Sequence, residues 1–318
     1  MKLEDFLKDK KIPYRKDVPL RLLTGMNLSG ILPYVAQPIN VEMLKELYLY
    51  VLDNGVSHEL AGGLTNTYLC SGFERDIIIQ TTKVQDLSFT DETVEVGCGY
   101  PLTKLSRMLS DKGITGYEGF IGIPGSVGGA AINNSSAFGS VMADVVLEVN
   151  ILDENGQFKT LSHDDMKYVT RGSLLKKHYF GIVTSVVLDI RSKQSPAIIA
   201  ERVDKVINER KKNIDGKRKS LGSIIVGSTV PRIWEHHKLA LFVRKLLYAP
   251  FKYTPIHKKV DCFLDFLVLG KPSLAKHCDN LGRFCWTKDT SEEAFFEYID
   301  FLRHVSRDKI ELEIEIKK

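Results

Sequence analysis

The chain has 318 residues, of which 43% are hydrophobic and 26% are charged, an ordinary globular composition that excludes wholesale disorder. Its formal net charge of +4 is too small to require a nucleic acid as a partner. The five cysteines form no CxxC pair, so the usual signal of a zinc or thioredoxin-like site is missing. Residues 1–11 are charged, and no apolar run approaches the roughly 18 residues of a spanning helix. We therefore expect a cytoplasmic protein with reduced thiols, no metal and no membrane span.

The first part of the chain alternates helical and strand patterns. Residues 40–55 place apolar side chains three and four apart, which predicts a helix that ends at Asn54-Gly55. Residues 102–113 predict a second helix, closed by glycine, and Asn155-Gly156 is typical of a hairpin turn. Runs rich in β-branched residues or with alternating polarity predict strands at 58–61, 76–80, 93–97, 143–152 and 181–190.

After residue 190 the pattern changes. Residues 197–212 and 291–305 predict helices, and residues 310–316 alternate like a strand. Residues 210–219 hold six basic residues and one acid, which is typical of a solvated loop or helix end, with an anion-binding surface as the alternative. We place a domain boundary near residues 191–197, and no internal repeat is visible.

Several standard catalytic and nucleotide-binding motifs are absent. The string GCGYPL at 97–102 begins like GxGxxG, but Leu102 replaces the third glycine and Pro101 stands where the helix should open. No P-loop, HExxH or GxSxG motif occurs. The chemistry must therefore come from a less common arrangement.

Two glycine-rich turns are the strongest local signal. Residues 119–130 contain five glycines in twelve positions, and residues 60–66 read LAGGLTN directly after a predicted strand. Glycine lets the backbone turn at positive φ and approach a ligand closely, and successive exposed N–H groups can bind an anion. Two such turns in one α+β domain suggest a ligand with a pyrophosphate; tight turns without a ligand are the alternative.

The residues of these turns carry a family resemblance. GIPGSVGGA at 122–130, followed by Asn134 and Ala137-Phe138-Gly139, resembles the signature of the UDP-N-acetylenolpyruvoylglucosamine reductases, the MurB family. LAGGLTN resembles that family's LGGGSN turn, and residues 18–30 resemble its opening segment. The resemblance covers about residues 18–316. It implies an α+β fold of the vanillyl-alcohol-oxidase (PCMH) type, with two FAD-binding subdomains in residues 15–192 that divide near residue 80 and a third, substrate-binding domain in residues 193–318.

The resemblance also implies ligands. They are non-covalent FAD, NADPH as co-substrate and a UDP-sugar substrate, for a reductase that makes UDP-N-acetylmuramate in peptidoglycan precursor synthesis. The residues that we expect to bind FAD lie in the two turns, just after the second turn, and on the strand at 181–190. They are Gly62, Gly63, Leu64, Thr65, Asn66, Gly122, Ile123, Pro124, Gly125, Ser126, Gly128, Gly129, Ala130, Asn134, Ile182 and Val183.

Three further positions match the family's catalytic ones. Arg171, in YVTRGS, falls on the arginine that holds the enolic carboxylate, and a guanidinium fork suits a planar carboxylate. Ser223, in LGS, falls on the serine that protonates the substrate carbon. Glu315, in LEIEI, falls on the acid that assists enol stabilisation. From the residues alone, the alternatives are a surface ion pair, a loop hydroxyl and a solvent-facing strand residue, respectively.

The substrate signature is less well kept than the cofactor signature. After Ser223 the family has FKNP, whereas this chain has IIVG, so the asparagine and lysine expected to help bind the nucleotide are missing. The family pattern is not recognisable between residues 240 and 275. Two alternatives to the reductase therefore stay open: a paralogous flavoprotein acting on another sugar nucleotide for surface polysaccharide, and a non-catalytic nucleotide-binding protein.

Overall fold

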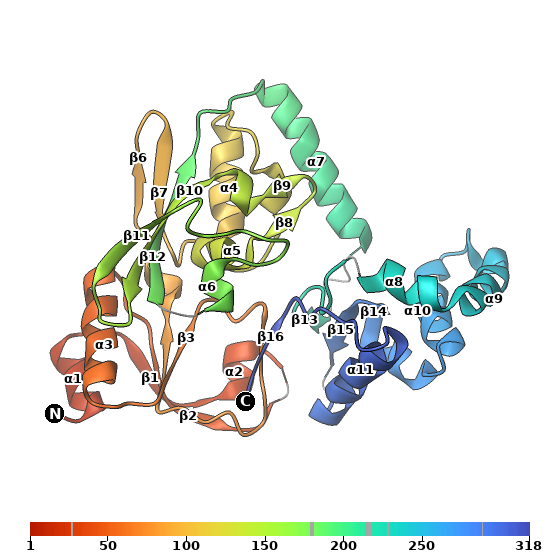
Figure 1. Cartoon of the computed structure of the whole chain (residues 1–318), viewed down its shortest axis with the longest axis horizontal. Coiled ribbons are helices and arrows are strands. Elements are labelled where there is room, and N and C mark those ends of the chain that lie inside the picture. The colour runs from red at the N-terminus through yellow and green to blue at the C-terminus, as the bar shows by residue number, and fades with distance from the viewer. Residues whose placement is uncertain (27, 179–180, 214–217, 228, 288) are drawn as a thin grey trace. The chain divides into compact units, whose positions relative to one another are not determined.

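A computed structural model describes the chain except for residues 27, 179–180, 214–217, 228 and 288 (Figure 1). Its contacts divide the chain into two compact units, and each contains several chain segments. Unit 1 comprises residues 1–18, 31–64 and 74–213. Unit 2 comprises residues 19–30, 65–73 and 214–318.

The first sheet of unit 1 is built from residues that precede Thr81. Its strand order is β1 (Tyr14–Pro19), β2 (Ile31–Ala36), β5 (Ile77–Gln80) and β3 (His58–Ala61), and β5 is parallel to both of its neighbours. The inner strand β5 is buried at every position, as expected for a parallel strand that is covered on both faces. The helices of this part are α1 (Leu3–Asp9) and α3 (Val41–Asp53). Asn40 caps α3 by accepting a hydrogen bond from the N–H of Met43 at 2.9 Å.

The second sheet of unit 1 is antiparallel and is built from residues that follow Asp86. Its order is β11 (Phe158–Ser162), β10 (Val146–Asp153), β12 (Gly181–Asp189), β7 (Thr93–Gly97) and β6 (Leu87–Phe89). The β10–β11 hairpin turns at Asn155-Gly156, where Gly156 has φ +69° as predicted for this dipeptide. The other elements are α4 (Leu102–Asp111), α5 (Val127–Asn133), β8 (Ser136–Ala137), β9 (Ser140–Val141), α6 (Leu174–Lys177) and α7 (Pro196–Asn213), with 3-10 turns η1 (Thr81–Lys83), η2 (Glu118–Phe120) and η3 (Met142–Asp144).

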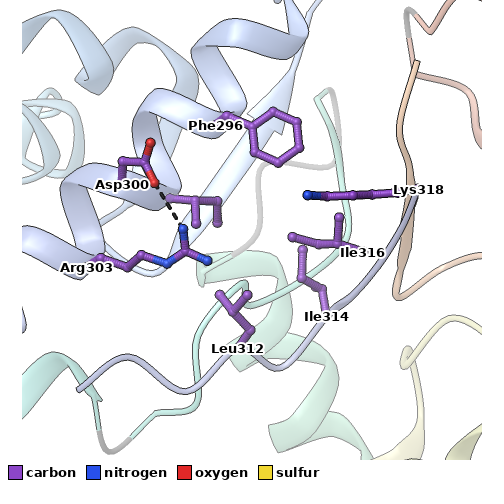
Figure 2. Close-up of a pocket in the computed structure, with 8 residues that line it drawn as sticks. Phe296, Asp300, Arg303, Leu312, Ile314, Ile316 and Lys318 are labelled. Carbon is purple, nitrogen blue, oxygen red and sulfur yellow. Dashed lines mark hydrogen bonds and ion pairs between the residues drawn. The ribbon is translucent and has the colours of Figure 1, made fainter. Parts of the chain in front are cut away.

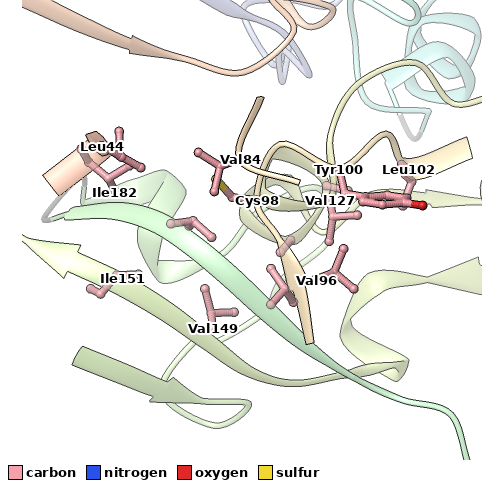
Figure 3. Close-up of a cluster of buried hydrophobic side chains, with 14 of the residues drawn as sticks. Leu44, Val84, Val96, Cys98, Tyr100, Leu102, Val127, Val149, Ile151 and Ile182 are labelled. Atoms are coloured by element: carbon pink, nitrogen blue, oxygen red, sulfur yellow. The ribbon is translucent and has the colours of Figure 1, made fainter. Parts of the chain in front are cut away.

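The core of unit 1 runs continuously from the first sheet to the second. Leu44 of α3, Val96 of β7 and Val127 of α5 are fully buried in one cluster with Ile151 of β10 (Figure 3). Burial of this cluster removes apolar surface from water and stabilises both sheets together. The unit is therefore an α+β domain with two sheet-containing subdomains.

Unit 2 is smaller and mostly helical. It holds a three-stranded sheet, ordered β13 (Lys219–Ser220), β15 (Arg283–Trp286) and β14 (Cys278–Asn280). Its fully buried aromatic residues include Phe284, Phe295 and Tyr298. The remaining elements are α2 (Leu20–Thr24), β4 (Thr67–Leu69), α8 (Thr229–His236), α9 (Lys238–Tyr248), η4 (Ala249–Phe251), α10 (His257–Val268), η5 (Pro272–His277), α11 (Glu292–Val305) and β16 (Glu315–Lys317).

The units differ from the predicted division at residues 191–197. Helix α7 belongs to unit 1 because its side chains bind the segment around η2: Arg202 forms an ion pair with Glu118 at 3.4 Å, and Arg210 donates to the Gly119 carbonyl at 3.1 Å. The final strand is also shorter than predicted: β16 begins at Glu315, and it pairs in parallel with β4, far away in the sequence. The basic run continues past the end of α7, and its residues 214–217 lie outside the described residues.

Of the helices in the described part of the chain, none combines the length and the apolar character needed to cross a membrane.

Candidate cofactor site and catalytic positions

The two glycine-rich turns meet in unit 1. The first turn follows β3, and the second connects η2 to α5. A Cβ atom on Gly62 would lie only 3.3 Å from Ser126 Oγ, so the backbone of the first turn approaches the side chain that begins α5. The sequence predicted two separate glycine turns, and the structure brings them together.

Several backbone N–H groups in these turns form no hydrogen bond inside the described part of the chain. Within the described residues, the N–H groups of Gly63, Leu64, Gly125 and Ser126 donate to no other group of the chain. Leu64 has φ +52° and Gly125 has φ +113°, left-handed conformations that turn successive amides in unusual directions. Amides arranged in this way form concave sites for anions such as phosphate.

The N-terminus of α5 itself is not available. The N–H of Val127 donates to the Tyr100 carbonyl at 2.9 Å, and the N–H of Gly129 donates to Ser126 Oγ at 3.4 Å. An anion at this site would therefore be held by the turn residues that precede the helix and not by the helix end.

Gly128 has a packing role within the fold, and its contact with FAD remains a prediction. Its φ is not positive, and its N–H donates to the Cys98 carbonyl at 2.9 Å. A Cβ atom on Gly128 would lie 2.8 Å from Cys98 Cβ and 3.0 Å from the Cys98 carbonyl oxygen. This glycine therefore lets α5 pack closely against the segment after β7, and a positive φ is not the reason for it.

Polar side chains that sequence reasoning missed support both turns. Gln80 donates to the Gly62 carbonyl at 3.3 Å and accepts a hydrogen bond from Gln37 at 2.7 Å. In the second turn, Thr103 accepts from the N–H of Gly122 at 3.0 Å and donates to the Ile123 carbonyl at 2.9 Å. No motif marks these residues, because they act on backbone groups that only the fold brings near them.

The other predicted cofactor residues have varied surroundings. Ile182 and Val183 lie on β12 within the hydrophobic core, and Ala130 is buried in α5. Pro124 is exposed and Ile123 is half-buried in the second turn. As FAD contacts, all of these residues remain predictions.

Asn134 connects the second turn to the loop that carries Arg171. Its amide group donates to the Val169 carbonyl and accepts from the N–H of Ala143, both at 2.9 Å. Ser173 adds a second link, since its hydroxyl donates to the Ile132 carbonyl at 2.7 Å. The half-buried Arg171 itself has φ +59°. Asn134 is thus a residue that positions the Arg171 loop against α5.

Two ionisable residues near these segments are perturbed by burial. Burial raises the pKa of Tyr168, whose hydroxyl finds no hydrogen-bond partner among the described residues. Burial also acts to raise the pKa of Glu118, but hydrogen bonds from its own N–H, Thr115 and Gly116, with the Arg202 pair, outweigh burial and lower that pKa. Glu118 is therefore a charged anchor for α7, and the Tyr168 hydroxyl is buried without a partner among the described residues.

Unit 2 brings the segments of Ser223 and Glu315 together. Ser223 is exposed, and the next residue, Ile224, accepts at its carbonyl from the N–H of Glu313 at 2.9 Å. Asn66, from the first turn, donates to the Glu313 carbonyl at 3.1 Å and accepts from the N–H of Glu315 at 3.0 Å. Asn66 and the half-buried Thr65 therefore belong to unit 2, and Asn66 holds the strand that carries Glu315.

A cavity of unit 2 lies on the other side of that strand. It is about 770 Å³ in volume, and Ile314 and Ile316 point into it, together with Phe296 and an Asp300–Arg303 ion pair of α11 (Figure 2). Because successive side chains of an extended segment point to opposite sides, Glu315 faces away from this cavity. The cavity has a size that suits a small molecule, but none of the predicted catalytic residues lines it.

Among the described residues, no group of three or more His, Cys, Asp or Glu side chains could hold a metal ion.

Known proteins are similar to this chain in sequence and in fold. Residues 32–162 match the family described as "FAD binding domain". UDP-N-acetylenolpyruvoylglucosamine reductase from Caldicellulosiruptor saccharolyticus is 32% identical over 178 residues, which are 56% of this chain and 57% of that protein. The reductase of the same name from Bacillus subtilis is 31% identical over 184 residues, 58% of this chain and 61% of that protein.

Among solved structures, UDP-N-acetylenolpyruvylglucosamine reductase (MurB) from Thermus caldophilus superposes with a TM-score of 0.65 at 20% identity, covering 96% of this chain and 99% of that one. At this identity, the likeness shows a shared fold. The chain thus has an α+β fold shared with this reductase, and residues 32–162 are similar to FAD-binding domains.

In sequence, the chain is similar to the UDP-N-acetylenolpyruvoylglucosamine reductases, the family whose motifs its own residues resemble. The aligned part spans less than two thirds of the length of each of the two curated reductases named above.

Proposed function

We propose that the chain binds FAD non-covalently and acts as a flavin-dependent oxidoreductase. The observation that carries this proposal is the meeting of two glycine turns with four open N–H groups, inside a segment that matches an FAD-binding domain. Those amides fit the anionic pyrophosphate of FAD. The first turn offers Leu64, Thr65 and Asn66 and no histidine, so it provides no histidyl tether for a covalent flavin.

The substrate that we propose is UDP-N-acetylglucosamine-enolpyruvate, reduced at its enolpyruvyl group to UDP-N-acetylmuramate for peptidoglycan synthesis in the cytoplasm. When bound, FAD supplies hydride chemistry, with NADPH as the source of the hydride. Arg171 holds the substrate carboxylate through bidentate donation and stabilises the charge that develops there. Ser223 donates the proton to the carbon that becomes basic, and Glu315 assists at the enol.

A second candidate, reduction or oxidation of a different sugar nucleotide, is favoured by the residues after Ser223. Ile224, Ile225 and Val226 are all buried, and their backbone pairs with residues 311–313. These positions carry no polar side chain that could bind a nucleotide, whereas the family has polar residues there. The nucleotide or its sugar can therefore differ between this chain and its relatives.

One experiment separates these candidates. The purified protein is assayed for released FAD after acid precipitation, and its NADPH-reduced form is mixed in a stopped-flow instrument with a panel of enolpyruvyl and other UDP-sugars. Reoxidation by the enolpyruvyl UDP-sugar alone supports the reductase, and reoxidation by another UDP-sugar supports the paralogue. Yellow colour that stays with precipitated protein contradicts non-covalent binding, and a colourless protein that binds no added FAD contradicts both candidates.

A further inference from the structure

Helix α9 of unit 2 exposes an apolar face. Its exposed side chains Leu239, Phe242, Val243, Leu246 and Leu247 recur at intervals of three and four residues, so they form one continuous stripe. Leu239 is 77% exposed and Leu246 is 60% exposed, and α9 has no fully buried residue. A helix of a globular protein normally turns such a stripe toward the core.

A polar contact fixes α9 in this inverted orientation. Arg244 lies on the side of α9 opposite the stripe and binds Asp261 and Asp265 of the neighbouring helix α10, with 2.7 Å between Arg244 Nη2 and Asp261 Oδ1. The Arg244 guanidinium also lies over the rings of Trp234 and Tyr248. Rolling α9 to bury the stripe would break this arrangement and leave the buried Asp265 without its cation.

The exposed apolar surface continues beyond α9. Ten of the twenty exposed large apolar side chains in the described part of the chain lie between residues 239 and 267. Besides the α9 stripe, they are Phe251, Tyr253, Ile256, Phe263 and Leu267. We call these ten residues the α9–α10 surface; α9 and α10 lie side by side (Figure 1). A concentration of this kind marks an interaction site and not scattered surface variation.

The charges around this surface are mostly positive, since its acids Asp261 and Asp265 both pair with Arg244. Residues 238–260 contain six lysines and arginines and no aspartate or glutamate. Lys238, Lys245, Lys252, Lys258 and Lys259 are exposed, and within the described residues none has a carboxylate within 4 Å. The partner must therefore accept apolar side chains and supply negative charge.

We infer that the α9–α10 surface binds the headgroup region of an anionic lipid bilayer. Apolar residues on one side with lysines around them are the pattern of helices that lie in a membrane interface. The eleven residues of α9 are too few to span a bilayer, so the association is peripheral. Lysine stems can lie along the apolar surface while their ammonium groups reach anionic headgroups.

A second copy of the chain is a poorer occupant. A two-fold symmetric dimer through this surface would place each set of five exposed lysines against its own copy, and the nearby acids Asp261 and Asp265 already pair with Arg244. A bilayer that contains anionic lipid supplies counter-charge along the whole surface. This inference is independent of the proposed flavin chemistry, because it uses none of the residues assigned to it.

The test is flotation of the full-length protein with vesicles. Vesicles of phosphatidylcholine alone are compared with vesicles of phosphatidylcholine and phosphatidylglycerol at 3:1, at 50 mM and 500 mM NaCl. The wild type is expected to float with the anionic vesicles at low salt, and to lose most of this binding at high salt or with the neutral vesicles.

Two variants separate the apolar and the charged contributions. The triple variant Leu239→Ser, Phe242→Ser, Leu246→Ser is expected to bind at least about 100-fold more weakly. The variant Lys238→Gln, Lys245→Gln, Lys252→Gln is expected to lose about 100-fold at low salt, roughly five-fold for each lysine. Because all six side chains are exposed, circular dichroism should show unchanged folding.

Matched controls replace exposed side chains of the same kind in unit 1. They are Ile31→Ser, Phe158→Ser, Ile198→Ser for the apolar set and Lys159→Gln, Lys193→Gln, Lys205→Gln for the charged set. Both are expected to bind vesicles like the wild type. The inference is overturned if the wild type does not float with anionic vesicles at 50 mM NaCl, if it binds neutral vesicles equally well, or if light scattering shows a dimer that the apolar triple variant dissociates while no vesicle binding occurs.

Discussion

Two adjacent glycines in α5 give the most direct test of how the second turn is built. A Cβ atom on Gly128 would lie 2.8 Å from Cys98 Cβ, whereas a Cβ atom on Gly129 would lie 3.6 Å from Ser126 Oγ, an ordinary contact. Carbon atoms prefer separations of about 3.5 Å or more, so Gly128→Ala must move α5 away from residue 98 by about 0.7 Å. Gly129→Ala requires no such movement.

The two variants share one effect and differ in another. Both replace glycine within a helix by alanine, which favours the folded state by about 0.5–1 kcal/mol in each. Only Gly128→Ala adds the cost of overpacking, about 1–3 kcal/mol. The difference between the two free energies of unfolding therefore isolates the overpacking, and we expect Gly128→Ala to be the less stable variant by about 1–3 kcal/mol.

The assay is urea unfolding of the FAD-free variants. Both tryptophans, Trp234 and Trp286, belong to unit 2, so fluorescence would not report on α5. At each urea concentration, unfolding of α5 is therefore followed by hydrogen exchange in peptides that contain residues 127–133. FAD retention should also fall in Gly128→Ala, since the shift of α5 displaces the open amides of Gly125 and Ser126. Equal stability of the two variants, within about 0.5 kcal/mol, would refute the packing role of Gly128.

Four further substitutions test the remaining assignments. Arg171→Lys should keep the fold and the FAD content but slow reoxidation by substrate far more than reduction by NADPH, because a point charge cannot donate in bidentate fashion; equal losses in both half-reactions would place Arg171 elsewhere. Ser223→Ala should leave reduction by NADPH nearly intact and slow reoxidation about 10²–10⁴-fold, with partial recovery in Ser223→Cys; an unchanged second half-reaction would exclude Ser223 as the proton donor. Asn134→Ala should lower the free energy of unfolding by about 1–3 kcal/mol, because the N–H of Ala143 and the carbonyl of Val169 lose their partners; urea titration showing no loss would contradict that role. Burial raises the pKa of Asp265 to about 6. The folded state therefore binds the proton of this carboxyl group more tightly than the unfolded state does. The stabilisation by this proton is complete below pH 4 and is lost as the pH rises through 6. Asp265→Asn should remove that slope when tryptophan fluorescence is measured from pH 4 to 7, and an identical slope in both proteins would show that Asp265 is not its source.

Local patterns predicted the parts of this fold that depend on neighbouring residues. The helix at residues 41–53 and the strand at 77–80 followed from apolar spacing, and the two glycine turns were visible because glycine is needed where the backbone turns sharply. The function of a particular glycine was less predictable. Nothing in the sequence indicated that Gly128 packs against Cys98, because Cys98 lies thirty positions away in the chain.

The rest of the site depends on contacts between distant segments. The side-chain amide of Asn134 donates to the Val169 carbonyl, and the side-chain amide of Asn66 donates to the Glu313 carbonyl. No local sequence pattern distinguishes an asparagine with such a structural role from one that binds a ligand. For the same reason, the sequence placed α7 with the C-terminal domain, whereas Arg202 and Arg210 tie it to η2. The orientation of α9 could not be predicted from the sequence. Its apolar stripe alone predicts a buried face, whereas the ion pair of Arg244 with Asp261 holds the opposite face against α10.

The pairing of β16 with β4 has a consequence for how the chain is made. Every segment of unit 1 lies within the first 213 residues, so this unit can fold on the ribosome while the rest of the chain is still being translated. Unit 2 takes two short pieces from early in the chain, and β4 gains its partner only when residues 315–317 have emerged. During that interval, β4 presents an unpaired edge that can capture a strand of another chain. A chain that ends before residue 315 would therefore have a folded unit 1 and an open, aggregation-prone edge at β4.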